Sequence, residues 1–185
     1  MKSLNTRLSA MKQVGKVATS KTRKIIADGV FKSKLVYLIS LWGGCEKYLI
    51  RSLQIVQNKA ARVVTKLDWN TNTQVLLSQC GWLSVLQLAV YHTLVLVHTV
   101  LQTRQPEYLH SFFSLDYRVK TRLADQQILK PSQVLTPEHD LVTDSFRWRA
   151  LRNWNSLPLD IRSISSTTKF KLQARIWVKA NVPLE

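Results

Sequence analysis

The sequence has 185 residues and a net charge of +16, from 27 Lys and Arg against 11 Asp and Glu. A hydrophobic share of 45% argues against a disordered basic tail, and five Gly and five Pro argue against a turn-rich all-β or low-complexity chain. Two cysteines, Cys45 and Cys80, are too few for a disulfide scaffold. We therefore expect an intracellular setting, nuclear or cytoplasmic.

The positive charge is concentrated at the two ends of the chain. Residues 1–67 hold 14 Lys and Arg and 2 acids, and residues 145–185 hold 8 and 2. The middle is close to neutral. Because a polyanion is attracted to such basic regions, this pattern favours a nucleic-acid partner. The alternative is a basic composition that serves solubility alone.

The first third of the chain has a helical period. Apolar residues step by three and four from Leu4 to Ile25, a break or bend is expected at Asp28-Gly29, and a second apolar stretch runs from Val30 to Trp42. Most cations of the first stretch lie away from its apolar face. The candidate phosphate-binding residues here are Lys12, Lys16, Lys21, Arg23 and Lys24.

The clearest helix is expected over residues 46–67. Its predicted core stripe consists of Leu49, Leu53, Val56, Ala60, Val63 and Leu67. The opposite stripe is predicted to hold Lys47, Arg51, Gln54, Asn58 and Arg62, with Lys59 and Lys66 beside it. Glu46 is the one acid of this segment, so ion pairs between i and i+4 do not explain the cations. Such a face suits a helix lying along a phosphate backbone, although an ordinary solvated face has the same composition.

The middle of the chain is apolar. No Asp, Glu, Lys or Arg occurs in residues 69–103, and the stretch 82–101 has about the 20 residues that a membrane span needs. The stretch also contains polar residues, among them Gln87, His92 and His98, so we favour a buried helix over a membrane span. Short helices are expected at 74–79, capped by Thr73, and at 107–113.

Residues 115–141 hold Pro131 and Pro137 and no sustained period, so they are expected to form a long loop. A helix should begin at Phe146 with Ala150 and Trp154 on its inner face. Arg149 and Arg152 lie mainly off that face and complete the candidate phosphate-binding set, although Arg149 could equally pack within the protein. The last helix should be capped by Ser165 or Ser166 and turn Phe170 inward.

These elements predict an all-α fold, a bundle of about six helices with a long loop before a C-terminal helix pair. We expect a helical domain over 1–114, a linker over 115–141 and a basic helix pair over 142–185.

The motifs of common enzymes are missing. The sequence has no acid pair that would bind Mg²⁺, no glycine-rich phosphate loop, and no zinc-ligand spacing around Cys80, His92 and His98. We therefore expect no catalytic residue, cofactor, metal or small-molecule substrate.

Four stretches, in order, resemble the region downstream of the polymerase palm in non-LTR (LINE-type, jockey/CR1-like) retrotransposon reverse transcriptases. They are Leu4–Ala10 running on to Ser33–Tyr37 and Leu41–Gly43; Leu53–Arg62; Gly81–Val85 with Tyr91; and Ser145–Ala150 with Trp154–Pro158 and Phe170-Lys171. Together they span nearly the whole chain.

The resemblance implies an α-helical thumb, which in this family helps to hold the template–primer duplex. The family's catalytic acids lie in a Y/F-x-D-D palm motif that this chain lacks, so no catalytic role passes to any residue here. The expected function is that of a non-catalytic fragment that binds the backbone of an RNA–DNA hybrid or duplex. Whether it acts with a polymerase palm in trans stays open. So do two alternatives: an interaction or membrane-associated protein that uses the 82–101 helix, and a relic without function.

Overall fold

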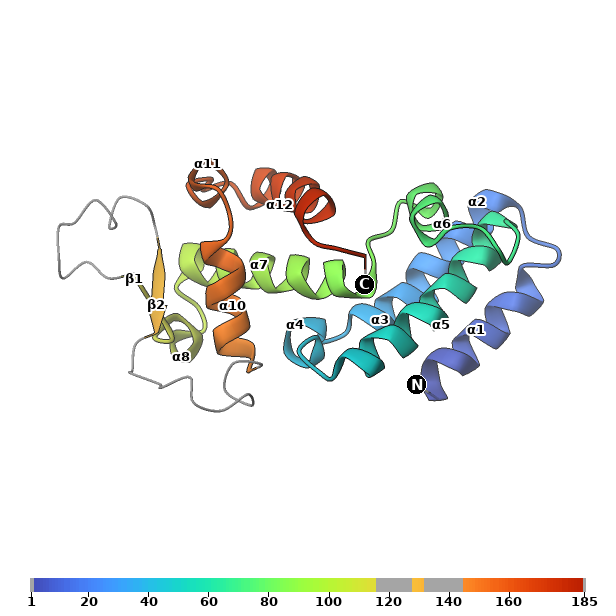
Figure 1. The fold of residues 1–185 in the computed structure, drawn as a ribbon, viewed down its shortest axis with the longest axis horizontal. Helices are drawn as coiled ribbons and strands as arrows, with labels where there is room; N and C mark the ends of the chain where they lie inside the picture. The colour runs from blue at the N-terminus through green and yellow to red at the C-terminus, as the bar shows by residue number, and fades with distance from the viewer. Residues whose placement is uncertain (1, 116–127, 132–144, 185) are drawn as a thin grey trace. The chain divides into compact units, whose positions relative to one another are not determined.

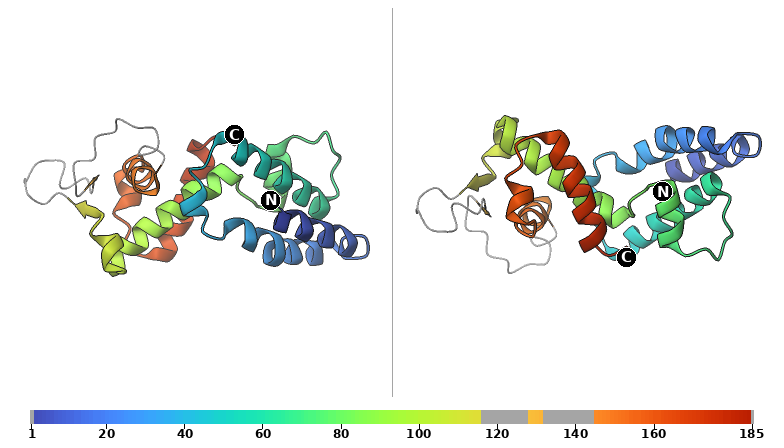
Figure 2. Two further views of the ribbon diagram at one scale, coloured as in Figure 1. Left: turned by 90° about the horizontal axis from the view of Figure 1, so that it is seen from below. Right: turned by 90° about the horizontal axis from the view of Figure 1, so that it is seen from above.

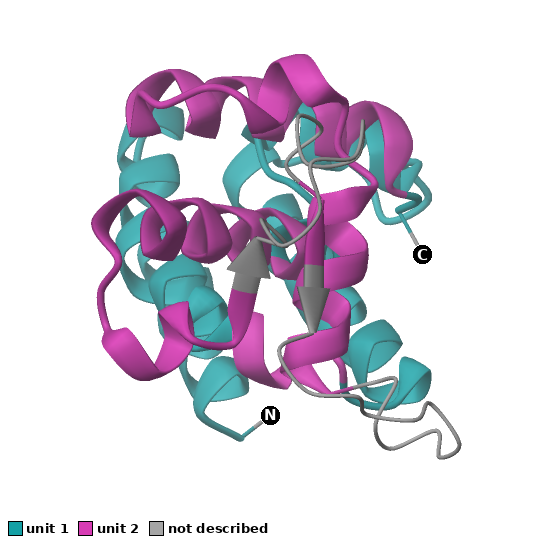
Figure 3. Cartoon of the chain, turned by 90° about the vertical axis from the view of Figure 1, so that its left-hand side faces the viewer, with its two compact units in different colours: residues 1–39, 45–88, 183–185 teal, residues 40–44, 89–182 magenta. Residues whose placement is uncertain are grey.

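The computed structural model describes residues 2–115, 128–131 and 145–184, and it confirms the all-α fold class (Figure 1). Six helices in these ranges have eight or more residues: α1 (Lys2–Val14), α5 (Lys47–Thr65), α6 (Thr73–Cys80), α7 (Val85–Thr103), α10 (Phe146–Asn155) and α12 (Thr167–Asn181). Shorter helical segments join them. The helices gather into two groups whose contacts are mostly internal, so the chain forms two compact units (Figure 3).

The helix expected from Leu4 to Ile25 is interrupted near Gly15, whereas no break occurs at Asp28-Gly29. Thr19 caps a second helix, α2 (Ser20–Ile26), by accepting the amide hydrogen of Thr22. A π-helical segment, η1 (Ala27–Lys32), then continues directly into α3 (Ser33–Val36), and α4 (Ile39–Trp42) follows. Asp28 accepts a hydrogen bond from the Trp82 indole, at 2.8 Å, so its side chain contributes to packing instead of ending the helix.

The core face of α5 is rotated from the predicted stripe. Gln54 and Gln57 are 2% and 1% exposed, while Leu49 lies at the surface. The two amides are buried because they bind the backbone that leads into α7: Gln54 accepts from the amide of Val85 at 2.8 Å, and Gln57 donates to the carbonyl of Leu83 at 2.9 Å. Asn58 is half-buried and bonds Gln54 and Thr73. The prediction that Gln54 and Asn58 line the outer face is therefore wrong.

Unit 1 consists of residues 1–39, 45–88 and 183–185. Within it α5 contacts α1, α2, η1 and α6, and both Figures 1 and 2 show α1 and α5 side by side. Unit 2 consists of residues 40–44 and 89–182. The structure thus divides the chain within α7, whereas the sequence pattern placed a boundary at residue 114.

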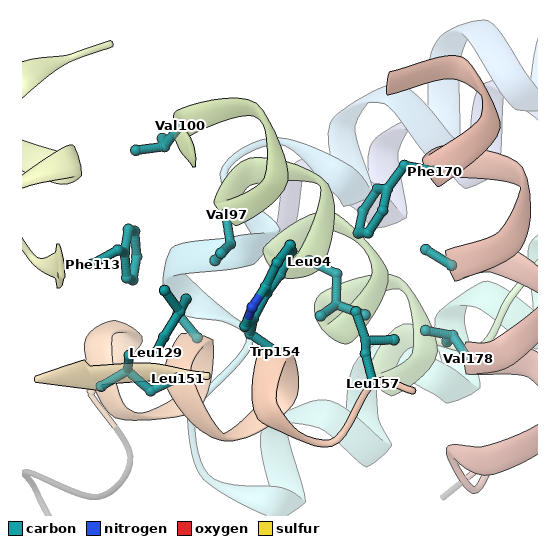
Figure 4. Close-up of a cluster of buried hydrophobic side chains, with 12 residues drawn as sticks. Leu94, Val97, Val100, Phe113, Leu129, Leu151, Trp154, Leu157, Phe170 and Val178 are labelled. Carbon is teal, nitrogen blue, oxygen red and sulfur yellow. The ribbon is translucent and has the colours of Figure 1, made fainter. Parts of the chain in front are cut away.

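The core of unit 2 explains this division. The second half of α7 buries Leu94 and Val97 against Trp154 of α10 and Phe170 of α12 (Figure 4). Trp154 and Phe170 are stacked with their ring centroids 5.8 Å apart. A helix that is apolar on most sides needs such cover. The segment α7 is long and apolar enough to cross a membrane, and half of that window is buried inside the protein, as in a core helix.

Two short strands lie inside or beside the segment expected to be a loop. After α8 (Glu107–His110), β1 (Phe113–Leu115) pairs antiparallel with β2 (Leu129–Pro131), with Ser114 opposite Lys130. The side-chain amide of Asn155 binds both the amide and the carbonyl of Leu129, each at 2.9 Å. The expectation of a loop over 115–141 is therefore wrong at Leu115 and at 129–131, while residue 128 belongs to no helix or strand. The rest of that segment, 116–127 and 132–141, lies outside the described residues.

Helices α10 and α12 begin at the expected positions, although neither of the serines before them makes a side-chain capping hydrogen bond. Ser145 precedes α10, Ser166 precedes α12, and α11 (Leu159–Arg162) lies between them. The inner positions Ala150, Trp154 and Phe170 are buried.

Candidate nucleic-acid interface

The end of α1 approaches the end of α5 closely because Gly15 has no side chain. A Cβ built on Gly15 would come within 2.9 Å of Val63 Cγ1 and of the Met11 carbonyl oxygen. Exposed cations lie within four residues of this contact in both segments: Lys12 and Lys16 near Gly15, and Lys59 and Lys66 near Val63. Cations from two parts of the sequence are thus brought together.

Along α5 the outer face is cationic. Lys47, Arg51 and Lys59 are exposed and follow one another at intervals of four and eight residues, and Lys66 continues the row just beyond the helix end. At a rise of about 1.5 Å per residue, positions four apart are about 6 Å apart along the axis. We call these four residues, with Lys12 and Lys16 of the α1 end, the cationic face.

Carboxylates do not neutralise the cationic face. In the described part of the chain, none of its six side chains has an ion pair or a hydrogen bond. The acid Asp28 instead pairs with Lys24 and Lys32. Burial opposes ionisation of Asp28, but hydrogen bonds from Lys24 and Trp82 and the charges of Lys24 and Lys32 outweigh it and lower the pKa of this carboxyl. The positive potential over α5 therefore stays open to an external anion.

Four of the predicted phosphate-binding residues contribute to the protein's own structure. Arg23 donates to the carbonyls of Val64 and Ala18, at 3.0 and 2.7 Å, and so ties α2 to the end of α5 and to the segment that follows α1. Lys24 lies over the ring of Trp82, 5.3 Å from its centroid, besides pairing with Asp28.

The other two are Arg62 and Arg149. Arg62 donates to the carbonyls of Trp69, at 2.7 Å, and Asp68, at 3.4 Å. Arg149 is 6% exposed and donates to the carbonyls of Ser40 and Leu41, at 3.0 and 2.8 Å. The expectation that Arg149 lies off the inner face of its helix is wrong.

The remaining eight candidates are exposed: Lys12, Lys16, Lys21, Lys47, Arg51, Lys59, Lys66 and Arg152. Seven belong to unit 1, and Arg152 belongs to unit 2. The structure therefore brings most of the exposed candidates together in one unit.

Sequence reasoning missed three apolar residues at this surface. Tyr48 and Ile55 lie on the outer side of α5 among its cations, and Trp69 follows the helix in the turn before α6; their exposed fractions are 64%, 55% and 84%. For Tyr48 and Ile55 the signal was available, because at 100° per residue positions 48, 55, 59 and 66 fall within one narrow stripe; the helical period gives no such signal for Trp69.

The described residues contain no group of three or more His, Cys, Asp or Glu side chains that could hold a metal ion. Burial raises the pKa of the Cys80 thiol to about 11, which keeps it in the unreactive thiol form. His98 is fully buried, with Nε2 2.7 Å from the Ile164 carbonyl oxygen and its ring stacked on Phe170.

Comparison with known proteins adds no relative, since no family model, curated protein or solved structure matches this chain.

Proposed function

We propose that the cationic face binds the sugar–phosphate backbone of an RNA–DNA hybrid or duplex without reading its sequence. In this proposal the chain is a non-catalytic, thumb-like part of a non-LTR retrotransposon reverse transcriptase. The observation that carries the proposal is the row of exposed cations on α5 and the α1 end, which have no carboxylate partner in the described residues. The thumb assignment is supported by the four stretches described above, which resemble the reverse transcriptase family and follow the same order along the chain.

Backbone binding needs no base-reading side chains. Phosphate contacts fix the position of a protein on nucleic acid, and their affinity comes from release of counterions by Lys and Arg. A rigid helix with cations repeated along one side meets this requirement. The sequence lacks the Y/F-x-D-D palm motif of the family it resembles, so the proposal assigns binding, and no chemistry, to this chain.

The test compares two triple variants of the full chain. Arg51→Gln/Lys59→Gln/Lys66→Gln removes three charges from the cationic face. Lys169→Gln/Lys171→Gln/Lys179→Gln removes three exposed charges from α12 and serves as the matched control. Fluorescence anisotropy with a labelled RNA–DNA hybrid measures the affinity of each.

We expect the first variant to lose affinity about tenfold or more at moderate salt, and to bind with a weaker salt dependence, by about one unit of log–log slope per residue removed. The control should stay close to the wild type. Equal losses in both variants would mean that net charge alone drives binding, and the proposal would fail.

A further inference from the structure

Trp69 presents its indole to solvent from a turn whose backbone is held in place. The side chain is 84% exposed, although tryptophan is a residue that proteins usually keep largely covered. Arg62 of α5 fixes the turn from one side through the Trp69 and Asp68 carbonyls. An internal bond from the Thr71 amide to the Asp68 carbonyl, at 3.2 Å, closes it.

The turn is also anchored at both of its ends. Lys66 ends α5 in left-handed geometry with its amide on the Arg62 carbonyl, at 2.9 Å. Asn72 caps α6 by accepting the Gln74 amide at 2.7 Å, and Asn58 binds Thr73 at 3.0 Å. The indole is thus exposed on a fixed support, so little ordering of the backbone would be needed when a ligand covers it.

The charges around Trp69 indicate which ligand fits. Lys66 is exposed three residues earlier and Arg62 contacts the turn directly, while Asp68 is the one carboxylate within it. A flat aromatic ring beside cations is the combination with which proteins hold unpaired bases: the ring stacks on a base while the cations follow the backbone. In a closed duplex every base is already stacked and paired, so this ring has no base to receive.

We propose that Trp69 stacks on an unpaired base of the nucleic acid whose backbone lies on the cationic face. The face therefore prefers a duplex with a single-stranded extension over a blunt duplex. This inference rests on the proposed function, because the cations must bring the strand to the ring. The ligand chemistry is a nucleobase with its phosphates, and no base identity is selected, since each base has a stacking face.

The experiment measures the affinity of the full chain for a blunt mixed-sequence duplex and for the same duplex with an unpaired extension. The wild type should bind the extended duplex more tightly. Trp69→Ala should lower affinity for the extended duplex about 5- to 150-fold, the range for losing one stacked base, and leave affinity for the blunt duplex unchanged. Trp69→Phe should retain part of the preference because it keeps an aromatic ring.

Tyr108→Ala is the matched control, since Tyr108 is an exposed aromatic residue of unit 2. It should behave as the wild type with both probes. Equal affinity of the wild type for both duplexes, or an equal loss with both in Trp69→Ala, would overturn the inference while leaving backbone binding intact. Self-association that disappears in Trp69→Ala, with the preference for the extension unchanged, would assign the indole to a second copy of this chain and also overturn it. Failure of the wild type to bind either duplex would instead refute the proposed function.

Discussion

Arg149 shows that the position of a cation in a sequence does not decide its role. The sequence places it beside Arg152 on the same helix, with the same charge, and both qualify as phosphate-binding residues. In the structure Arg152 is exposed, while Arg149 donates to the carbonyls of Ser40 and Leu41, more than a hundred residues away. That partner is invisible to any local pattern, because it depends on how distant segments pack.

Replacing Arg149 should therefore affect stability before it affects binding. Arg149→Met leaves two backbone carbonyls without their charged donor, and hydrogen bonds of this kind contribute about 1.5–3 kcal/mol each. We expect a fall of about 2–4 kcal/mol in the free energy of unfolding, measured by urea denaturation. Arg152→Met should change it by less than about 0.5 kcal/mol, as is usual at exposed sites. Similar effects of the two changes would contradict the assigned roles.

His98 makes stability depend on pH. Its Nε2 donates to the Ile164 carbonyl, so Nδ1 is the site of protonation, and Nδ1 is buried without a partner in the described structure. Burial lowers the pKa of His98 from its ordinary 6.5, an effect that the Ile164 hydrogen bond only partly offsets. The unfolded chain therefore takes up this proton at a higher pH than the folded chain does.

The sign of the effect follows from that difference. The stabilisation that comes from holding His98 in its neutral form is complete above pH 6.5. It is lost as the pH falls below 6.5 toward the lower pKa of the folded state. The loss is at most about 1.4 kcal/mol per pH unit for one proton. Denaturation curves at a series of pH values should show this slope in the wild type and a shallower slope in His98→Phe. Identical slopes would show that other groups set the acid sensitivity.

At the scale of elements, the sequence predicted most helices and their inner residues, as with Trp154 and Phe170, because a helical period in apolar residues reports packing directly. It failed where polar side chains fill the core. The buried face of α5 includes Gln54 and Gln57 because their side-chain amides bind the backbone at Val85 and Leu83. A hydrophobicity scale assigns glutamine to the surface, so the sequence pattern placed this face elsewhere on the helix. The pairing of β1 with β2 was missed because three-residue strands have too few residues to show alternation.

Gly15 and Gly29 provide a matched test of the approach of α1 to α5. Gly15→Ala would place a methyl group 2.9 Å from Val63 Cγ1, so the two helices must separate, at a cost of about 1–3 kcal/mol. Gly29 has nothing within 4 Å of an added Cβ and lies in a helical segment, so Gly29→Ala should stabilise the protein by about 0.5–1 kcal/mol. Thermal unfolding followed by circular dichroism measures both. A neutral Gly15→Ala would mean that the contact is less tight than the structure has it.

At the scale of the whole molecule, charge is the property that the sequence predicted best. The counts of Lys, Arg, Asp and Glu in residues 1–67 already imply unpaired cations, and packing cannot change a count. What the sequence left unresolved is which cations the fold uses itself. Arg23, Lys24 and Arg62 have partners within the protein, whereas the six side chains of the cationic face have none in the described residues.

In the proposed binding, the number of cations in this face sets the salt dependence. If its six residues each neutralise a phosphate, log Kobs against log salt should fall with a slope of roughly −5 for a duplex. Titrations of an RNA–DNA hybrid at several potassium chloride concentrations give this slope. Binding that does not change with salt would show that phosphate contacts do not supply the affinity.

The backbone of Lys66 has a consequence for how this surface can evolve. Its φ of 61° is a conformation that glycine adopts freely, whereas a lysine there carries a conformational cost of about 1–2 kcal/mol. A glycine at this position would raise the free energy of unfolding and would remove a positive charge beside Trp69. Lysine at this position therefore carries a conformational cost, and in the proposed binding that cost accompanies a positive charge beside Trp69.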